Sequence, residues 1–214
     1  MLNLLYKEFK LSIHPFFLLF PFLIGALMLI PQWIFTLVPL YFCFVSIPNL
    51  FSSYKAFNDL SFLAMLPVSK SDIVKARIGA VVGLELLHIL LAAIFALLNR
   101  AIYHNPNNFA LDLNPAFFGL VFVIYGVFNL IMLPMFFKTG YSFGVPLIIS
   151  ITAATLLGLG MELLIIFNSS LRYLMEESGN GIQALLLILG MGLFTLSIFE
   201  TYILSIRRFE SVDV

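Results

Sequence analysis

Long apolar stretches alternate with short polar segments along the whole chain. A bilayer has a hydrocarbon core of about 30 Å, which a helix crosses in about 20 residues because each residue adds about 1.5 Å. Lipid also forbids unpaired backbone groups, and a helix satisfies its own. The pattern therefore predicts an all-α integral membrane protein with six transmembrane helices, at about residues 11–30, 33–50, 78–98, 115–137, 145–167 and 181–206.

The first of these runs is the shortest. Its strictly apolar part, residues 16–30, would reach only about 22 Å as a helix. Either the crossing begins near Leu11, or the segment stays partly immersed as a re-entrant hairpin. We favour the complete crossing, separated from the second run at Pro31, because proline disfavours helix for the residue before it.

Basic residues are divided unequally between the connecting segments. Cytoplasmic loops retain Lys and Arg, so the side with more of them faces the cytoplasm. Six crossings leave Arg100 and Arg172 on one side. They place nine basic residues on the other, namely Lys7, Lys10, Lys55, Lys70, Lys75, Arg77, Lys138, Arg207 and Arg208. Both termini are therefore predicted to be cytoplasmic.

Residues 51–77 form the most informative polar segment, between the second and third crossings. Asn58 or Ser53 is a suitable N-cap for a short helix that runs to Leu66. Pro67 would stop this helix, because proline cannot continue one. We therefore expect a separate cytoplasmic helix before the third crossing.

A second helix begins soon after. Ser69 and Asp72 have the three-residue spacing of a capping box, and apolar residues follow them directly. This signal predicts a helix start that leads without interruption into the third crossing.

The first thirteen residues have an amphipathic pattern. Apolar side chains recur at spacings of three and four, at Leu2, Leu5, Phe9 and Ile13. This spacing predicts an interfacial helix that lies on the membrane surface. A cytoplasmic extension of the first crossing fits the same periodicity equally well.

Composition supports lipid as the solvent of a single transmembrane domain, residues 1–214. Hydrophobic residues make up 62% of the chain and charged residues 10%, against about 45–50% and about 25% in ordinary globular domains. The net charge is zero, which argues against nucleic acid as a partner. The single cysteine, Cys43, can form neither a disulfide framework nor a cysteine metal cluster within one chain.

No catalytic or cofactor motif is evident. Lys138-Thr139 ends like a phosphate-binding loop, but residues 133–137 contain no glycine that would bring backbone amides around a phosphate. Zinc-helix and nucleophile-elbow motifs are missing too, so we expect no metal site and no catalytic residues. If a membrane chain of this kind moves a substrate, it needs free energy from an ion gradient or from another subunit.

Ionisable side chains inside the predicted crossings are the candidates for a transport path. Each costs about 2.5–3.5 kcal/mol on insertion scales, so each needs a reason. Glu85 and His88 are three residues apart and share one helix face, while Glu162 and Glu200 lie on the fifth and sixth crossings. They could line a substrate path, or they could be hydrogen-bonded groups that only hold helices together.

These features together resemble the ABC-2 type permeases. The resemblance rests on six crossings, on the N-terminus Met1-Leu2-Asn3-Leu4-Leu5-Tyr6-Lys7-Glu8-Phe9, and on the stretch Leu66-Pro67-Val68-Ser69-Lys70-Ser71-Asp72-Ile73-Val74. That stretch is typical of a small bacterial subgroup that includes the permease subunits of phenol-soluble modulin exporters. The resemblance implies a multi-pass protein of a bacterial cell membrane that exports amphipathic or hydrophobic cargo, a peptide or a lipid-like molecule.

The resemblance also implies partners. A separate ABC ATPase would bind ATP and Mg, so this chain would hold no cofactor, and a second permease copy, identical or related, would complete the transporter. The ATPase would dock on the coupling helix between crossings two and three. The residues that this helix implies are Phe57, Asn58, Asp59, Leu60, Ser61, Leu63, Ala64, Leu66 and Pro67.

An ion-coupled secondary transporter or channel that uses Glu85 and His88 is the alternative. An intramembrane enzyme fits less well, because no nucleophile and base occur at helical spacing.

Overall fold

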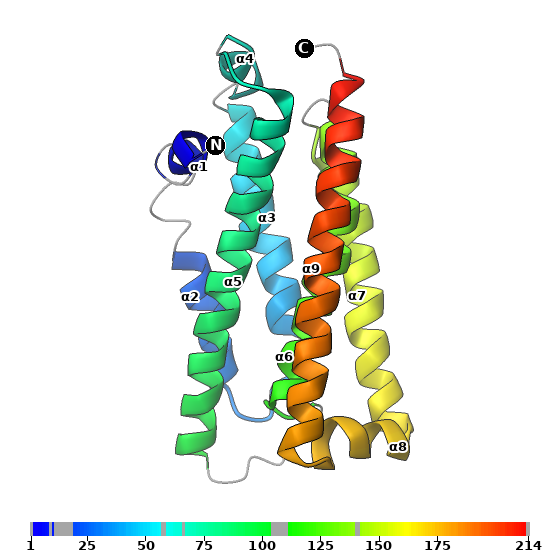
Figure 1. Cartoon of the computed structure of the whole chain (residues 1–214). Helices are drawn as coiled ribbons and strands as arrows, with labels where there is room; N and C mark the ends of the chain where they lie inside the picture. Colours follow the sequence, from blue (N-terminus) through cyan, green and yellow to red (C-terminus); the bar gives the residue numbers. More distant parts are fainter. Residues whose placement is uncertain are drawn as a thin grey trace.

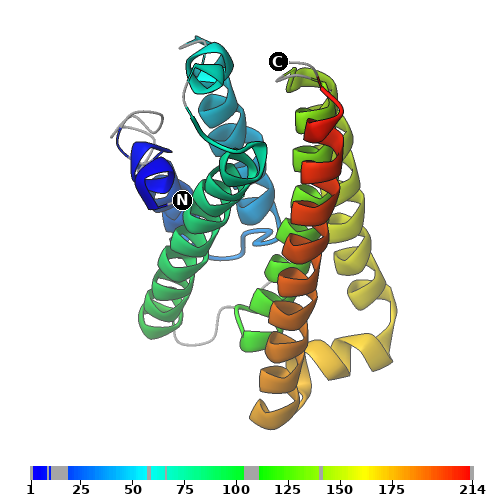
Figure 2. The same ribbon diagram turned by 45° about the horizontal axis from the view of Figure 1, so that its top comes forward.

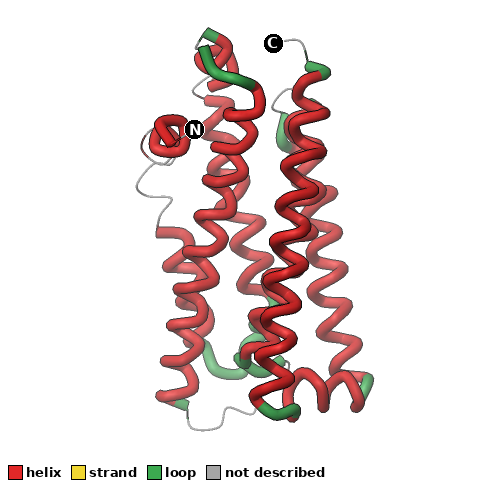
Figure 3. Tube along the Cα trace, in the orientation of Figure 1, coloured by secondary structure: helices red, strands yellow, loops and turns green. Residues whose placement is uncertain are grey.

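The computed structural model describes residues 2–8, 10, 19–56, 59–65, 67–103, 111–139 and 142–212, which are helical with short connections (Figure 3). The elements are α1 (Leu2–Lys7), α2 (Leu19–Gly25), the 3-10 helix η3 (Ala26–Leu29), α3 (Leu37–Ala56), α4 (Asp59–Ala64), α5 (Lys70–Ile102), α6 (Pro115–Lys138), α7 (Gly144–Phe167), α8 (Ser169–Arg172), the π-helix η4 (Tyr173–Glu177) and α9 (Asn180–Glu210).

Five helices are long and apolar enough to cross a membrane, namely α3, α5, α6, α7 and α9. The five corresponding predictions are confirmed at this level. The first predicted crossing corresponds to α2 and η3, which together reach only about 18 Å. Residues 11–18 lie outside the described residues, so a complete first crossing remains a prediction.

The arrangement of the ends follows the charge pattern. Figure 1 shows α1, α4 and the C-terminal end of α9 at one end of the bundle, with α8 at the other. Arg100, close to the end of α5, and Arg172 in α8 belong to the α8 end. The cytoplasmic position of the α4 end remains a prediction.

Helix α5 begins at a polar N-cap and not at the start of its apolar run. Ser69 is the N-cap of α5, and its hydroxyl oxygen accepts a hydrogen bond from the Asp72 amide at 3.1 Å, which confirms the predicted capping signal. Consequently α5 begins eight residues before the predicted crossing at residue 78. The short helix predicted before Pro67 is present as α4, with the narrower bounds Asp59–Ala64, and its coupling role remains a prediction.

The second predicted crossing is shifted along the chain. A turn follows η3, and Gln32 in it has the left-handed φ of 57°. Residues 33–36 make turns rather than helix, so α3 begins at Leu37 and not at Trp33. Helix α3 then continues past Leu50 to Ala56, because a helix can extend beyond the apolar run that predicts it.

The bundle has two halves. Figure 2 shows α1 to α5 on one side and α6, α7 and α9 on the other, with α6 and α9 packed most extensively. Gly119 of α6 faces Gly190 of α9 so closely that a Cβ on Gly119 would lie 2.6 Å from the Leu186 carbonyl oxygen. The first half touches the second much more sparsely, so the seam between them positions the groups described next.

Candidate functional site

Four charged side chains from three segments meet at the α4 end of the bundle. Lys7 and Arg77 both donate hydrogen bonds to Asp59 of α4. A Glu8 carboxylate oxygen lies 3.6 Å from the Arg77 guanidinium and 3.4 Å from the Lys7 amino group. We call Lys7, Glu8, Asp59 and Arg77 the charge cluster, and it ties the N-terminal segment and α4 to the long helix α5.

The charge cluster is withdrawn from solvent. Arg77 is fully buried, Glu8 is 2% exposed and Asp59 is 5% exposed. The Arg77 guanidinium also lies 3.4 Å above the centroid of the Tyr54 ring of α3, at the distance of a cation–π contact. Two positive and two negative groups give the cluster zero net charge, and burial is tolerable only while the opposite charges balance.

Helix α4 therefore has an inner and an outer face. Asp59 and Leu63 point into the protein, and Leu63 is 2% exposed. Phe62 is 50% exposed and Met65, directly after the helix, is 83% exposed. Phe62 and Met65 thus give α4 an exposed apolar face at this end of the bundle.

The predicted coupling residues are distributed unevenly over these faces. Pro67 is exposed beyond the helix. Phe57, Asn58 and Leu66 lie outside the described residues, while Leu60, Ser61 and Ala64 are described only through the backbone of α4.

Glu85 and His88 lie at the seam between the two halves. Asn129 of α6 donates a hydrogen bond of 2.8 Å to the Glu85 carboxyl group. The Tyr125 hydroxyl lies 2.7 Å from His88 Nδ1, and the Phe42 ring stacks on the imidazole with 4.6 Å between centroids. The two halves are thus joined at this depth by two hydrogen bonds between α5 and α6.

The other two predicted path residues lie elsewhere. Glu162 of α7 is 5% exposed, and its carboxylate oxygens have no hydrogen-bond partner among the described residues. Glu200 is exposed on α9. The structure therefore brings together Glu85 and His88, and it brings neither Glu162 nor Glu200 to them.

Sequence reasoning missed the partners of these groups. In the sequence, Lys7 and Arg77 indicate only the orientation of the chain in the membrane. Tyr125 and Asn129 are four residues apart, hence on one helix face, and this spacing on an apolar helix is a signal that could have matched them to Glu85 and His88. Among the described residues, no group of three or more His, Cys, Asp and Glu side chains could hold a metal ion.

Replacing Asn129 by leucine tests the seam. Leucine cannot donate a hydrogen bond to Glu85. We therefore expect the free energy of unfolding to fall by about 1 kcal/mol, which is close to the usual net contribution of one hydrogen bond between helices. Unfolding in mixed detergent micelles measures it. Thr152→Val is the control, because that exposed hydroxyl bonds only to its own helix, at Ile148. Equal stability of both variants would contradict a role for this bond.

One known protein family matches nearly the whole chain. The family profile described as "ABC-2 family transporter protein" matches residues 3–210. Neither a curated protein nor a solved structure matches the chain.

Proposed function

Because this chain belongs to the ABC-2 family of transporter proteins, we propose that it is the permease subunit of an exporter whose ATP is hydrolysed by a separate subunit. The observation that carries the proposal is the construction of α4. Buried ion pairs fix one face of this helix, and the opposite face leaves Phe62 and Met65 exposed at the end of the bundle.

The charge cluster provides a route for force. A partner that pressed on α4 would displace Asp59, and Asp59 is bound to Arg77 of α5. Since α5 is a continuous helix of 33 residues, about 50 Å long, its movement would carry Glu85 and His88 along the seam. Movement of the ATPase would in this way reach the contact between the two halves.

The exposed face of α4 is the test of ATPase docking. We expect Met65→Asp combined with Phe62→Asp to abolish copurification of the ATPase, identified by its phosphate-loop sequence, from native membranes. The reason is that both changes place charge in an apolar interface. Phe167→Asp is the matched control, because Phe167 is 84% exposed at the opposite end of the bundle. Retained binding by the double variant would refute docking on α4.

Transport measurements separate the two classes of transporter. In vesicles, the chain with its ATPase should move amphipathic peptide only when ATP is present, and the chain alone should hydrolyse no ATP. Flux driven by an ion gradient without the ATPase would favour the alternative, a secondary transporter that uses Glu85 and His88. The Glu85→Gln variant tests whether the ionisable carboxyl group of Glu85 is needed. Glutamine can still accept the hydrogen bond from Asn129, but it cannot ionise.

We propose peptides of the phenol-soluble modulin type as cargo, on the resemblance of residues 66–74 alone.

A second permease copy is supported by Glu200. This carboxylate is exposed on a helix whose neighbouring exposed residues, Leu193, Leu196 and Phe199, are apolar. A charge at this position costs less when another protein chain covers it than when it faces lipid.

A further inference from the structure

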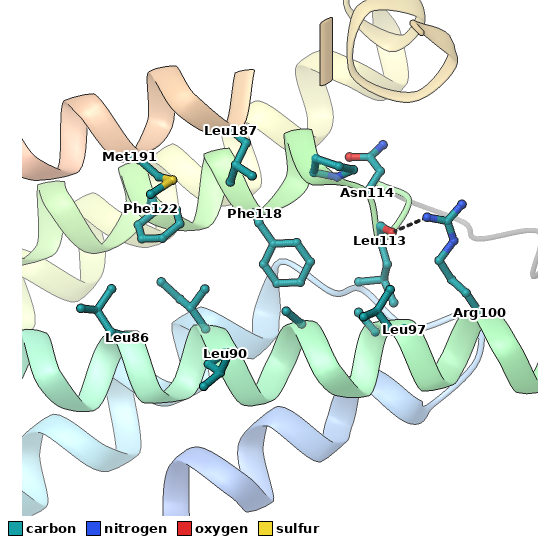
Figure 4. Close-up of a pocket in the computed structure, with 14 residues that line it drawn as sticks. Leu86, Leu90, Leu97, Arg100, Leu113, Asn114, Phe118, Phe122, Leu187 and Met191 are labelled. Carbon is teal, nitrogen blue, oxygen red and sulfur yellow. Dashed lines mark hydrogen bonds between the residues drawn. The ribbon is translucent and has the colours of Figure 1, made fainter. Parts of the chain in front are cut away.

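A lateral groove lies on the seam, between α5 on one side and α6 and α9 on the other (Figure 4). Its volume is about 500 Å³, and its walls are almost wholly apolar. Leu90 and Ala93 line it from α5, and Phe118 and Phe122 from α6. Leu90 is 59% exposed, so the groove is open to the surroundings of the bundle.

The groove has the length of one leaflet. Its lining on α5 extends from Leu86 to Arg100, fifteen residues with a rise of about 21 Å. Half of the hydrocarbon core measures about 15 Å, so a groove that began at headgroup depth would end near the bilayer centre. Its inner end reaches Phe122, one helical turn from Tyr125 and the hydrogen bonds of the seam.

Among the described residues that line the groove, Arg100 is the one cation, and it lies at one end of the groove. Arg100 is exposed, and its guanidinium makes one long hydrogen bond of 3.5 Å, to the Leu113 carbonyl oxygen (Figure 4). No carboxylate among the described residues lies within 4.0 Å of it. Arg172, at the same end of the bundle, instead pairs with Glu176 at 2.8 Å.

We propose that this groove binds one acyl chain of an anionic glycerophospholipid whose phosphate contacts Arg100. An apolar groove left empty in a bilayer would lose dispersion contacts along its walls, and hydrocarbon restores them. The arginine adds charge complementarity, since guanidinium binds phosphate oxygens well. A lipid seated there lies between the two halves and fills the space into which α5 would have to move against α6.

The inference is independent of the proposed export function, because it concerns lipid binding by the permease chain alone. Native mass spectrometry of the full-length protein, released from detergent and titrated with dioleoyl phosphatidylglycerol or dioleoyl phosphatidylcholine, tests it. We expect the first phosphatidylglycerol to bind about fivefold more tightly than phosphatidylcholine, the factor that one cation near the membrane surface contributes.

Two variants separate the headgroup from the chain. Arg100→Gln should remove the preference for phosphatidylglycerol and retain lipid binding. Ala93→Trp should fill the groove and lower first-site occupancy about tenfold for both lipids. The controls are Arg172→Gln, at the other arginine of this end, and Leu156→Trp, at a 71% exposed position on α7 outside the groove lining.

Three results would overturn the proposal. The first is an unchanged preference in Arg100→Gln, and the second is unchanged first-site binding in Ala93→Trp. The third is that Ala93→Trp dissociates a dimer and leaves lipid binding intact, since the groove would then hold a second copy of the chain. Should Ala93→Trp fail to fold, Leu90→Trp, at the exposed edge of the groove, replaces it with the same expected loss.

Discussion

Replacing Asp59 by asparagine is expected to lower the free energy of unfolding by about 3–5 kcal/mol, the usual cost of removing one partner from a buried ion pair. Asp59 accepts hydrogen bonds from both Lys7 and Arg77, and Glu8 lies farther from each of them. Without it, only Glu8 would balance two cations, of which Arg77 is fully buried. Unfolding in mixed detergent micelles, followed by circular dichroism, measures the loss.

A second substitution shows whether charge balance is the cause. In the double variant Asp59→Asn with Lys7→Met, Arg77 and Glu8 remain as one neutral pair at 3.6 Å. We expect this double variant to be more stable than Asp59→Asn alone, which independent losses could not produce. Glu176→Gln removes the exposed Arg172–Glu176 pair and should cost less than about 1 kcal/mol. An Asp59→Asn variant as stable as Glu176→Gln would contradict the charge cluster as the anchor of α4.

The Gly190→Ala substitution on α9 is expected to be the other strongly destabilising change, by about 3 kcal/mol. Gly190 lies directly on the backbone of Gly119 of α6, with no side chain between them that could move aside. A methyl group there must push apart the two helices that make the largest contact in the protein, and overpacking typically costs about 1–3 kcal/mol and occasionally more. Thermal melting measures the difference.

The same helix supplies the control. Gly192 lies two residues further along α9, and a Cβ built on it meets nothing within 4 Å. Alanine is a better helix former than glycine, so Gly192→Ala should leave the melting temperature unchanged or raise it slightly. Opposite signs for the two substitutions would establish that contact with α6 causes the loss. Two variants that melt alike would contradict the close approach of Gly119 and Gly190.

The two predictions concern contacts in different halves of the bundle. The glycine contact holds α6 to α9 in the second half. The charge cluster holds α4 to α5 in the first half. Between the described parts of the two halves lie fewer contacts and the lateral groove. These contacts include the hydrogen bonds of Glu85 and His88 with α6, and those of Lys70 and Ser71 with Val212 and Tyr202. Movement driven through α4 would therefore be resisted least along this seam.

The membrane class, the approximate positions of five long apolar helices and the start of α5 could all be predicted from the sequence. These properties depend on local rules. Apolar run length reports membrane crossing, and the cap at Ser69 is a contact between residues three apart. The short helix α4 was also predictable, because Pro67 ends it and a helix signal precedes it. Family membership could be inferred in the same way, from residues contiguous in the chain.

The pairing of the polar groups became visible only in the packed helices. Lys7, Asp59 and Arg77 are far apart in sequence, and nothing in their local patterns pairs them. Asp59, expected on the docking surface, instead points inward, while Phe62, which the predicted coupling set omitted, lies outside. The physical reason is that a helix pattern fixes which residues share a face, whereas the neighbour of that face depends on how all the helices pack.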